Sequence, residues 1–213
     1  MQLLPRHSNA FSRRRILVSG AVTGMAGAFG FAWARPSQAT AAADQANDAK
    51  ILNGALYYEH QAIWAYQFAA TKLSDSEVGQ AVLALAQRNL ADHMAHRDTL
   101  AAVVSSLGGT PVTAEDSYDV SAYIQSGEGN IDSDVNIAKL ALALETDAAI
   151  AYTSEIANLK TPALITAGAS IGSTESAHAT AIRAAFVSLG VSIDYVPASF
   201  VSADTRTEWV LKV

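Results

Sequence analysis

Glu175-Ser-Ala-His178 and, one half-chain earlier, His93-Met-Ala-His96 are the two stretches of sequence that decide the fold. Residues three apart on a helix project from the same face, so each stretch can direct two side chains to one point in space. Carboxylate and imidazole groups that converge in this way are typical metal ligands. We therefore interpret both stretches as parts of helices that carry a metal site.

An internal repeat relates these two stretches. Reading on from His96 and from His178 gives Ser-Leu-Gly at the same distance, with an offset of 82 residues. Upstream, residues 59–66 and 145–152 share the pattern Glu-x6-Tyr, with an offset of 86 residues. Such a repeat predicts two copies of a helical hairpin, and together these would form one four-helix bundle.

The composition restricts both the fold and the chemistry. The length of 213 residues allows one ordinary domain with a hydrophobic core and some additional segments. The chain is rich in alanine and half of it is apolar, which favours helices. Because it has no cysteine, disulfides and thiolate metal sites are excluded, and any metal must be bound through nitrogen and oxygen.

The charged residues and histidines are distributed unevenly. Beyond Ala39 the chain has nine basic and twenty acidic residues, a net charge of −11. Such a surface repels nucleic acid and anionic membranes, so neither is an expected partner. Four of the five histidines lie in or beside the repeated motifs, namely His60, His93, His96 and His178. This clustering favours a shared role for them.

Residues 1–39 have the pattern of a twin-arginine signal peptide. The stretch Ser12-Arg-Arg-Arg-Ile-Leu17 resembles the export motif, and a mildly apolar run from Ile16 to Ala34 follows it. Small residues predict cleavage after Ala39 or after Ala43. We expect a periplasmic or secreted protein without stable membrane insertion after cleavage. An uncleaved membrane anchor is the alternative, since the run is just long enough to span a bilayer.

Residues 48–190 predict an all-α, antiparallel four-helix bundle. A polar lead-in, residues 40–47, is expected to precede it. The helical spacing of apolar residues predicts helices at residues 48–72, 77–107, 133–159 and 162–189.

The connections predict the topology of the bundle. Ser74 to Glu77 has the form of a capping box, which would begin the second helix after a short loop and make it antiparallel to the first. Thr161-Pro162 supplies an N-cap and a first helical residue for the fourth helix. Residues 109–132 lack helical periodicity and predict a long crossover between the second and third helices. The tail, residues 191–213, is expected either to pack on the bundle or to extend against another subunit.

Six side chains would meet inside this bundle. They are Glu59 on the first helix, His93 and His96 on the second, Glu145 on the third, and Glu175 and His178 on the fourth. Four-helix di-metal carboxylate proteins use one glutamate from each of two helices and Glu-x-x-His from each of the other two. Carboxylates neutralise and bridge hard divalent cations, so iron or manganese is expected, with coordination positions open to oxygen or peroxide.

On these motifs the chain resembles the ferritin-like domain proteins, the family of ferritin, rubrerythrin and manganese catalase. The resemblance covers about residues 48–189. It implies a centre of two iron or manganese ions and a small oxidant such as oxygen or peroxide as the reaction partner. It also implies that Tyr66 and Tyr152, which end the two Glu-x6-Tyr motifs, lie two turns from the ligands as hydrogen-bond partners.

His93 departs from the family pattern, which has a bridging glutamate at this position. An imidazole cannot bridge two metals through two oxygens. The site would therefore hold two metals bridged by Glu175 and water, hold one metal, or no longer bind metal. Asp92 and His60 would lie in the outer shell, although Asp92, four residues before His96, could also contribute the missing carboxylate.

These observations leave several functions open. The first is an exported metalloprotein that reacts with oxygen or peroxide, as an oxidase, a peroxide scavenger or an iron handler. The second is a metal-free or single-metal bundle that acts in stress protection or binds another protein. A storage cage like ferritin is less favoured, because nothing identifies the surfaces that cage assembly needs. Formation of a homo-oligomer stays open.

Overall fold

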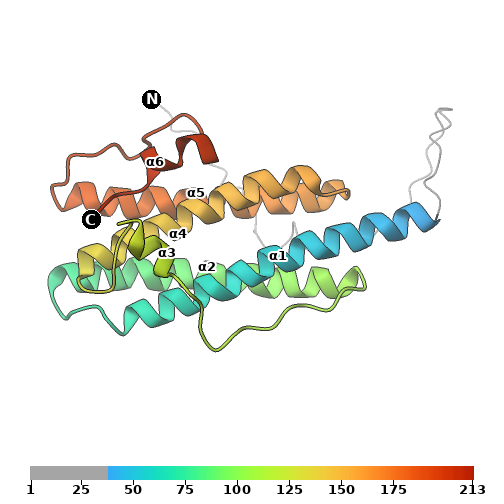
Figure 1. Cartoon of the computed structure of the whole chain (residues 1–213), viewed down its shortest axis with the longest axis horizontal. Coiled ribbons are helices and arrows are strands. Elements are labelled where there is room, and N and C mark those ends of the chain that lie inside the picture. The colour runs from blue at the N-terminus through green and yellow to red at the C-terminus, as the bar shows by residue number, and fades with distance from the viewer. Residues whose placement is uncertain (1–37) are drawn as a thin grey trace, which may run out of the picture. The chain divides into compact units, whose positions relative to one another are not determined.

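Four long helices dominate the computed structural model, which describes residues 38–213 (Figure 1). Their bounds are α1 Gln38–Ala70, α2 Glu77–Ser106, α4 Asp134–Glu155 and α5 Pro162–Ser188. The shorter elements are α3 Ser121–Gln125, the 3-10 turns η2 Ile156–Asn158 and η3 Ala203–Thr205, and α6 Arg206–Trp209. α1 packs mainly on α2, and α4 mainly on α5, so the bundle consists of two hairpins. The prediction of an all-α four-helix bundle is confirmed.

The first helix begins earlier than its predicted start near residue 48. Residues 40–47, which we predicted as a lead-in to the bundle, are helical and belong to α1. Their alanines favour a helix, but most of them are exposed, so no apolar periodicity marks them in the sequence. In Figure 1 this end of α1 extends beyond the other three long helices.

Most of the predicted signal peptide, residues 1–37, lies outside the described residues. The two expected cleavage positions, Ala39 and Ala43, are exposed on the first turns of α1. Among the helices from residue 38 onward, none combines the length and the apolar composition that crossing a membrane requires.

Two aspartates tie each hairpin to the loop of the other. Asp134, at the start of α4, accepts a hydrogen bond of 2.8 Å from the amide of Ser74 in the α1–α2 loop. Asp48, 86 residues earlier, is fully buried and accepts from the amides of Lys160 (2.7 Å) and Thr161 (3.0 Å) in the α4–α5 loop. The offset that relates the two Glu-x6-Tyr motifs therefore also relates these contacts between the hairpins.

The cap of α2 lies two residues after the one that we predicted. Ser76 is the N-cap, and its hydroxyl accepts a hydrogen bond of 3.0 Å from the amide of Gly79. The capping box expected from Ser74 and Glu77 is wrong, because the hydroxyl of Ser74 donates to Asp134 instead. The neighbouring hairpin thus determines which serine caps the helix.

The crossover and the C-terminal tail both lie against the bundle. The crossover, residues 109–132, runs back along the bundle and contains the short helix α3, which has too few residues to show a periodicity. The tail packs on its own bundle, since Trp209 is 3% exposed and joins the core. Arg183, buried on α5, donates hydrogen bonds to the carbonyls of Trp209 (2.6 Å) and Asp194 (2.8 Å) and so holds the tail in place.

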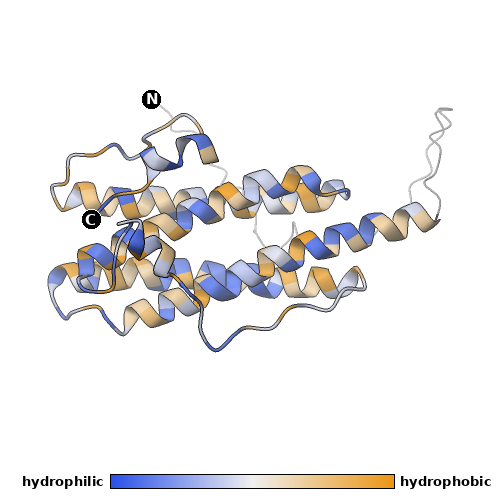
Figure 2. Cartoon of the chain, viewed as in Figure 1, coloured by the Kyte–Doolittle hydropathy of each residue, from blue (hydrophilic) through white to orange (hydrophobic). Residues whose placement is uncertain are grey.

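The apolar core is divided into two clusters by polar side chains. One cluster includes Leu56 and Val104, and the other includes Leu142 and Phe186. Figure 2 shows hydrophobic and hydrophilic residues interleaved along every long helix, as expected when one face of each helix is buried. Buried glutamates and histidines lie between the clusters along the bundle axis.

Candidate metal centre

The structure brings the six predicted ligands together in the middle of the bundle. They come from all four long helices, as predicted: Glu59 from α1, His93 and His96 from α2, Glu145 from α4, and Glu175 and His178 from α5. All are buried except for His96, whose side chain is 13% exposed. Their helix spacing places each pair on the inward face, so the repeated motifs meet as the sequence indicates.

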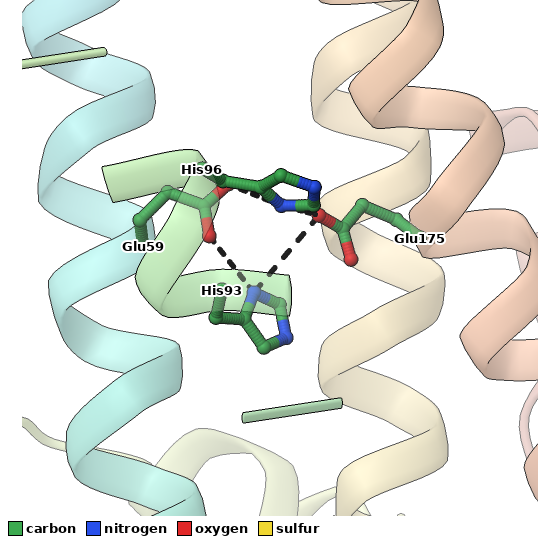
Figure 3. Close-up of side chains that lie close together, drawn as sticks. All are labelled: Glu59, His93, His96 and Glu175. Atoms are coloured by element: carbon green, nitrogen blue, oxygen red, sulfur yellow. Dashed lines mark hydrogen bonds and ion pairs between the residues drawn. The ribbon is translucent and has the colours of Figure 1, made fainter. Parts of the chain in front are cut away.

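The first group of donor atoms comes from Glu59, His93, His96 and Glu175 (Figure 3). The Nδ1 atom of His96 lies 3.0 Å from Oε1 of Glu175 and 3.5 Å from Oε1 of Glu59. The Nδ1 atom of His93 lies 2.8 Å from Oε2 of Glu59. One donor atom from each of these four residues lies within 4.8 Å of the others, a span that a single cation can bridge.

The second group comes from His93, Glu145, Glu175 and His178. The Nδ1 atom of His178 lies 3.2 Å from Oε2 of Glu145 and 3.1 Å from Oε2 of Glu175. The Nε2 atom of His93 lies 3.2 Å from Oε1 of Glu145. These donor atoms also lie within 4.8 Å of one another, so the structure contains two adjoining groups of four.

His93 and Glu175 belong to both groups. The two oxygens of Glu175 face different histidines, Oε1 facing His96 and Oε2 facing His178. The two nitrogens of His93 likewise face different glutamates, Nδ1 facing Glu59 and Nε2 facing Glu145. The imidazole therefore lies between the two groups, and Glu175 has the position of a bridging carboxylate.

Two buried atoms in the first group have no hydrogen bond. These are Nδ1 of His96 and Oε1 of Glu175, which face each other at 3.0 Å without the geometry of a hydrogen bond. A buried polar atom without a hydrogen bond destabilises the fold, and a cation bound between this nitrogen and this carboxylate oxygen would coordinate both atoms. The donor set and this pair of atoms fit a hard divalent metal ion.

Each tyrosine of the repeat binds the glutamate of the other hairpin. The hydroxyl of Tyr152 donates to Oε1 of Glu59 at 2.5 Å, and the hydroxyl of Tyr66 donates to Oε1 of Glu145. Burial and the neighbouring carboxylates raise the pKa of both tyrosines well above the ordinary value, so the phenols stay protonated as donors. Each tyrosine can thus fix the orientation of the glutamate that it contacts.

Asn89 is a site residue that the sequence analysis missed. It is 1% exposed, and its amide donates to the hydroxyl of Tyr66 (2.9 Å) and to Oε1 of Glu145 (3.3 Å). The only signal in the sequence is its spacing of four residues before His93, which places it on the same face of α2. The residue 82 positions later is the apolar Ile171, so the repeat does not reveal it.

Asp92 and His60 lie outside the two groups of donor atoms. Asp92 accepts from Arg88 at 2.7 Å and lies 3.3 Å from Nε2 of His178. It therefore faces the outer nitrogen of His178, where it can hold the ring with Nδ1 toward the centre, and it does not replace the missing carboxylate beside His96. The Nε2 atom of His60 lies 3.2 Å from the carbonyl of Val112, so this histidine contacts the crossover.

The glutamates of the centre raise the pKa of its histidines. Burial lowers the pKa of His96 and His178, but the carboxylate of Glu175 and that of one further glutamate beside each ring outweigh it and raise the pKa to about 9 for His96 and about 10 for His178. The same opposition raises the pKa of His93 well above the ordinary value. The neighbouring carboxylates thus favour the protonated form of the three imidazoles, and a cation that binds through the same nitrogens must displace protons.

Comparisons with known proteins agree with this architecture. The family model described as a ferritin-like domain matches residues 47–188. A solved structure of a conserved hypothetical protein from Mycobacterium tuberculosis is similar in fold, with a TM-score of 0.54 and 24% identity over 65% of this chain and 96% of that chain. Among curated proteins, none matches the chain. Because the family model covers most of the described bundle, including all six candidate ligands, this chain belongs to the ferritin-like domain family.

Proposed function

We propose that this chain is an exported metalloprotein that holds iron or manganese at its centre and reacts with oxygen or peroxide. The observation that carries this proposal is the group of four converging donors, in which the buried Nδ1 of His96 and Oε1 of Glu175 face each other without a hydrogen bond. Glu59, His96 and Glu175 would hold one ion, and Glu145, His178 and Glu175 a second.

The chain's own residues would shape the chemistry. A bound iron or manganese ion supplies one-electron redox chemistry and coordination positions for a small oxidant. Tyr66 and Tyr152 fix the orientation of the glutamates, and Asp92 fixes the ring of His178. Each phenol also donates a hydrogen bond to a candidate metal ligand, Tyr66 to Glu145 and Tyr152 to Glu59, and can act there as a proton or electron donor. Export is supported by the arginine motif at residues 12–17.

Elemental analysis of protein exported by its own cells tests the proposal. Mild purification, followed by exposure to Fe(II) and Mn(II) separately, should give one to two ions per chain. The matched control is Glu175→Gln, which keeps the shape of the side chain and removes its negative charge. Less than about a tenth of an ion per chain in the unaltered protein, with both metals offered, would contradict the proposal.

The second candidate is a metal-free bundle for stress protection or protein binding. The contacts among the histidines and glutamates favour it, because imidazoles with a raised pKa can pair with the carboxylates without a metal ion. Thermal melting with and without a chelator separates the two functions. A chain that holds metal should melt at a lower temperature after chelation, since an ion at 100 times its Kd stabilises the fold by about 2.7 kcal/mol. A metal-free bundle should melt at the same temperature in both conditions.

A further inference from the structure

A groove lies beside the centre along the seam between α1 and α4. It consists of two adjoining cavities of about 430 Å³ and 510 Å³. The first reaches Tyr66 and Glu145, and the second reaches Glu59 and Tyr152. The residues that line both cavities are Tyr58, Ala62, His93, Ala148, Ala151 and Glu155. His93 therefore lies where the groove meets the centre, and each cavity borders one Glu–Tyr pair.

Alanines of the repeat keep this seam open. Ala62 and Ala65 line it from α1, and Ala148 and Ala151 line it from α4, at the offset of 86 residues that relates Glu59 to Glu145. A methyl group is too short to fill the space between two facing helices, so the groove remains between them. The alanines occupy the turns next to the glutamates, which gives a molecule in the groove access to the centre.

The first cavity is lined mainly by apolar and aromatic side chains. The rings of Trp64 and Phe68 stack with their centroids 5.2 Å apart, and Val120 and Ile131 of the crossover add apolar surface. Outside the centre, the charged side chains of this lining are Asp147 and Glu155. The carboxylate of Asp147 lies 2.5 Å from Nε of Arg206, which neutralises it. Outside the centre no cationic side chain lines the cavity, so an anionic ligand finds no counter-ion there, whereas apolar ligands gain contact with rings and aliphatic chains.

We infer that the first cavity binds an uncharged, mainly apolar organic molecule of aromatic size beside the centre. The volume of about 430 Å³ lies in the range of small-molecule sites and far exceeds what oxygen or peroxide needs. This inference rests on the proposed function in one respect, because it makes the bound molecule the substrate of the metal centre. Binding itself requires only the groove, so it can be measured without metal.

Two fluorescent probes with the same ring skeleton test the inference. The neutral N-phenyl-1-naphthylamine should bind the chelator-treated full chain with a rise in fluorescence and a stoichiometry near one. Its sulfonated analogue, 8-anilinonaphthalene-1-sulfonate, should bind at least about tenfold more weakly, because burying an unpaired sulfonate is costly. Equal or tighter binding of the charged probe would overturn the inference.

Matched variants locate the probe in the groove. Ala148→Phe fills the space that both cavities share and should weaken binding of the neutral probe at least about tenfold. Ala102→Phe, at an exposed position of α2, adds the same ring elsewhere and should leave the affinity unchanged. Ile131→Asp places a charge in the lining of the first cavity at a residue that is not a candidate ligand, and it should also weaken binding. This second variant keeps the test conclusive if Ala148→Phe fails to fold.

The outcomes separate this inference from the proposed function. Equal affinities of the unaltered chain, Ala148→Phe and Ile131→Asp would show that the probe binds elsewhere and would overturn the inference. Metal content is measured on the same samples by elemental analysis. Metal without probe binding would refute the groove alone, and probe binding in the groove without metal would refute the proposed function alone.

Discussion

His93 is the residue that makes the two halves of the centre unequal. Its counterpart 82 residues later is Glu175, whose oxygens face one histidine in each half. His93 faces one glutamate in each half instead, and as an imidazolium ion it donates a proton to both. The position that would supply a second bridging carboxylate therefore supplies positive charge, which opposes the binding of a second cation.

Restoring the carboxylate should increase metal binding. We expect His93→Glu to raise the amount of bound Fe(II) or Mn(II) toward two ions per chain, because the substitution adds a ligand and removes a competing positive charge. Elemental analysis after equilibrium dialysis measures the change. The matched control is His60→Glu, which makes the same substitution beside the crossover. Equal metal contents in the two variants would contradict this account of His93.

Removing the shared carboxylate should have the opposite effect. Outer-shell partners of metal ligands are worth about 10- to 100-fold in affinity, so loss of a ligand in both groups should cost about 100-fold or more. Titration calorimetry with Mn(II) compares Glu175→Gln with the unaltered chain. Asp98→Asn serves as the control, because Asp98 lies on α2 with a side chain that is 72% exposed. A similar affinity in all three proteins would show that Glu175 is not a ligand.

At the scale of single residues, the internal repeat allowed us to select the six candidate ligands, because each motif in the first half of the chain has a counterpart at a fixed offset in the second half. The partners of those ligands were harder to predict. Asn89 has an apolar counterpart, and a single asparagine carries no pattern of its own. The spacing of Asp92 to His96 shows what the side chain could reach along α2. In the folded chain its carboxylate instead lies 3.3 Å from Nε2 of His178 on α5. Contacts across helices decide such positions, and one helix cannot reveal them.

At the scale of the elements, contacts between the hairpins come in reciprocal pairs. Asp48 and Asp134 each bind the loop of the opposite hairpin, and Tyr66 and Tyr152 each bind the opposite glutamate. Each hairpin therefore depends on the other for the ends of its helices and for the orientation of its ligand. We expect the two hairpins to unfold together.

The buried aspartate should contribute strongly to stability. Asp48→Ala removes a carboxylate that accepts hydrogen bonds from two amides, and we expect it to lower the free energy of unfolding by about 2–4 kcal/mol. Asp134→Ala should cost less, because its partners can turn to water. Urea denaturation monitored by circular dichroism measures both. Asp44→Ala, on the projecting turns of α1, should change little, and a loss comparable to that of Asp48→Ala would contradict this assignment.

Helix positions followed from the sequence where an apolar face or a proline marks them. Pro162 begins α5 as predicted, and the predicted ranges of the other long helices overlap the observed ones. The errors lie where such marks are missing. The start of α1 is exposed on all sides, α3 is shorter than two turns, and the cap of α2 depends on Asp134 from another helix.

At the scale of the whole molecule, one charged cluster joins the crossover to the tail. Glu128, in the crossover, accepts from both terminal nitrogens of Arg206 at 2.8 Å and 2.7 Å and from Lys212 at 2.9 Å. Its side chain is 6% exposed. Hydrogen bonds from Arg206 outweigh burial and, with those from Lys212, lower the pKa of Glu128 from 4.5 to about 2.

This lowered pKa predicts a dependence of stability on acid. Because the pKa is lower in the folded chain, the stabilisation is fully present above about pH 4.5 and is lost as the pH falls toward 2. We expect the free energy of unfolding to fall more steeply over this range for the unaltered chain than for Glu128→Gln, by up to about 3 kcal/mol. Urea denaturation between pH 6 and pH 2.5 measures this difference, and parallel profiles would contradict it.

The reciprocal aspartate and tyrosine contacts bear on how an unequal centre could arise. A half-length ancestor with one hairpin could have made every such contact between two identical subunits of a homodimer. Symmetry would then have required the same residue at both bridging positions. Once duplication and fusion had placed both hairpins in one polypeptide, each copy could diverge alone, and a histidine could replace one glutamate while the other was retained.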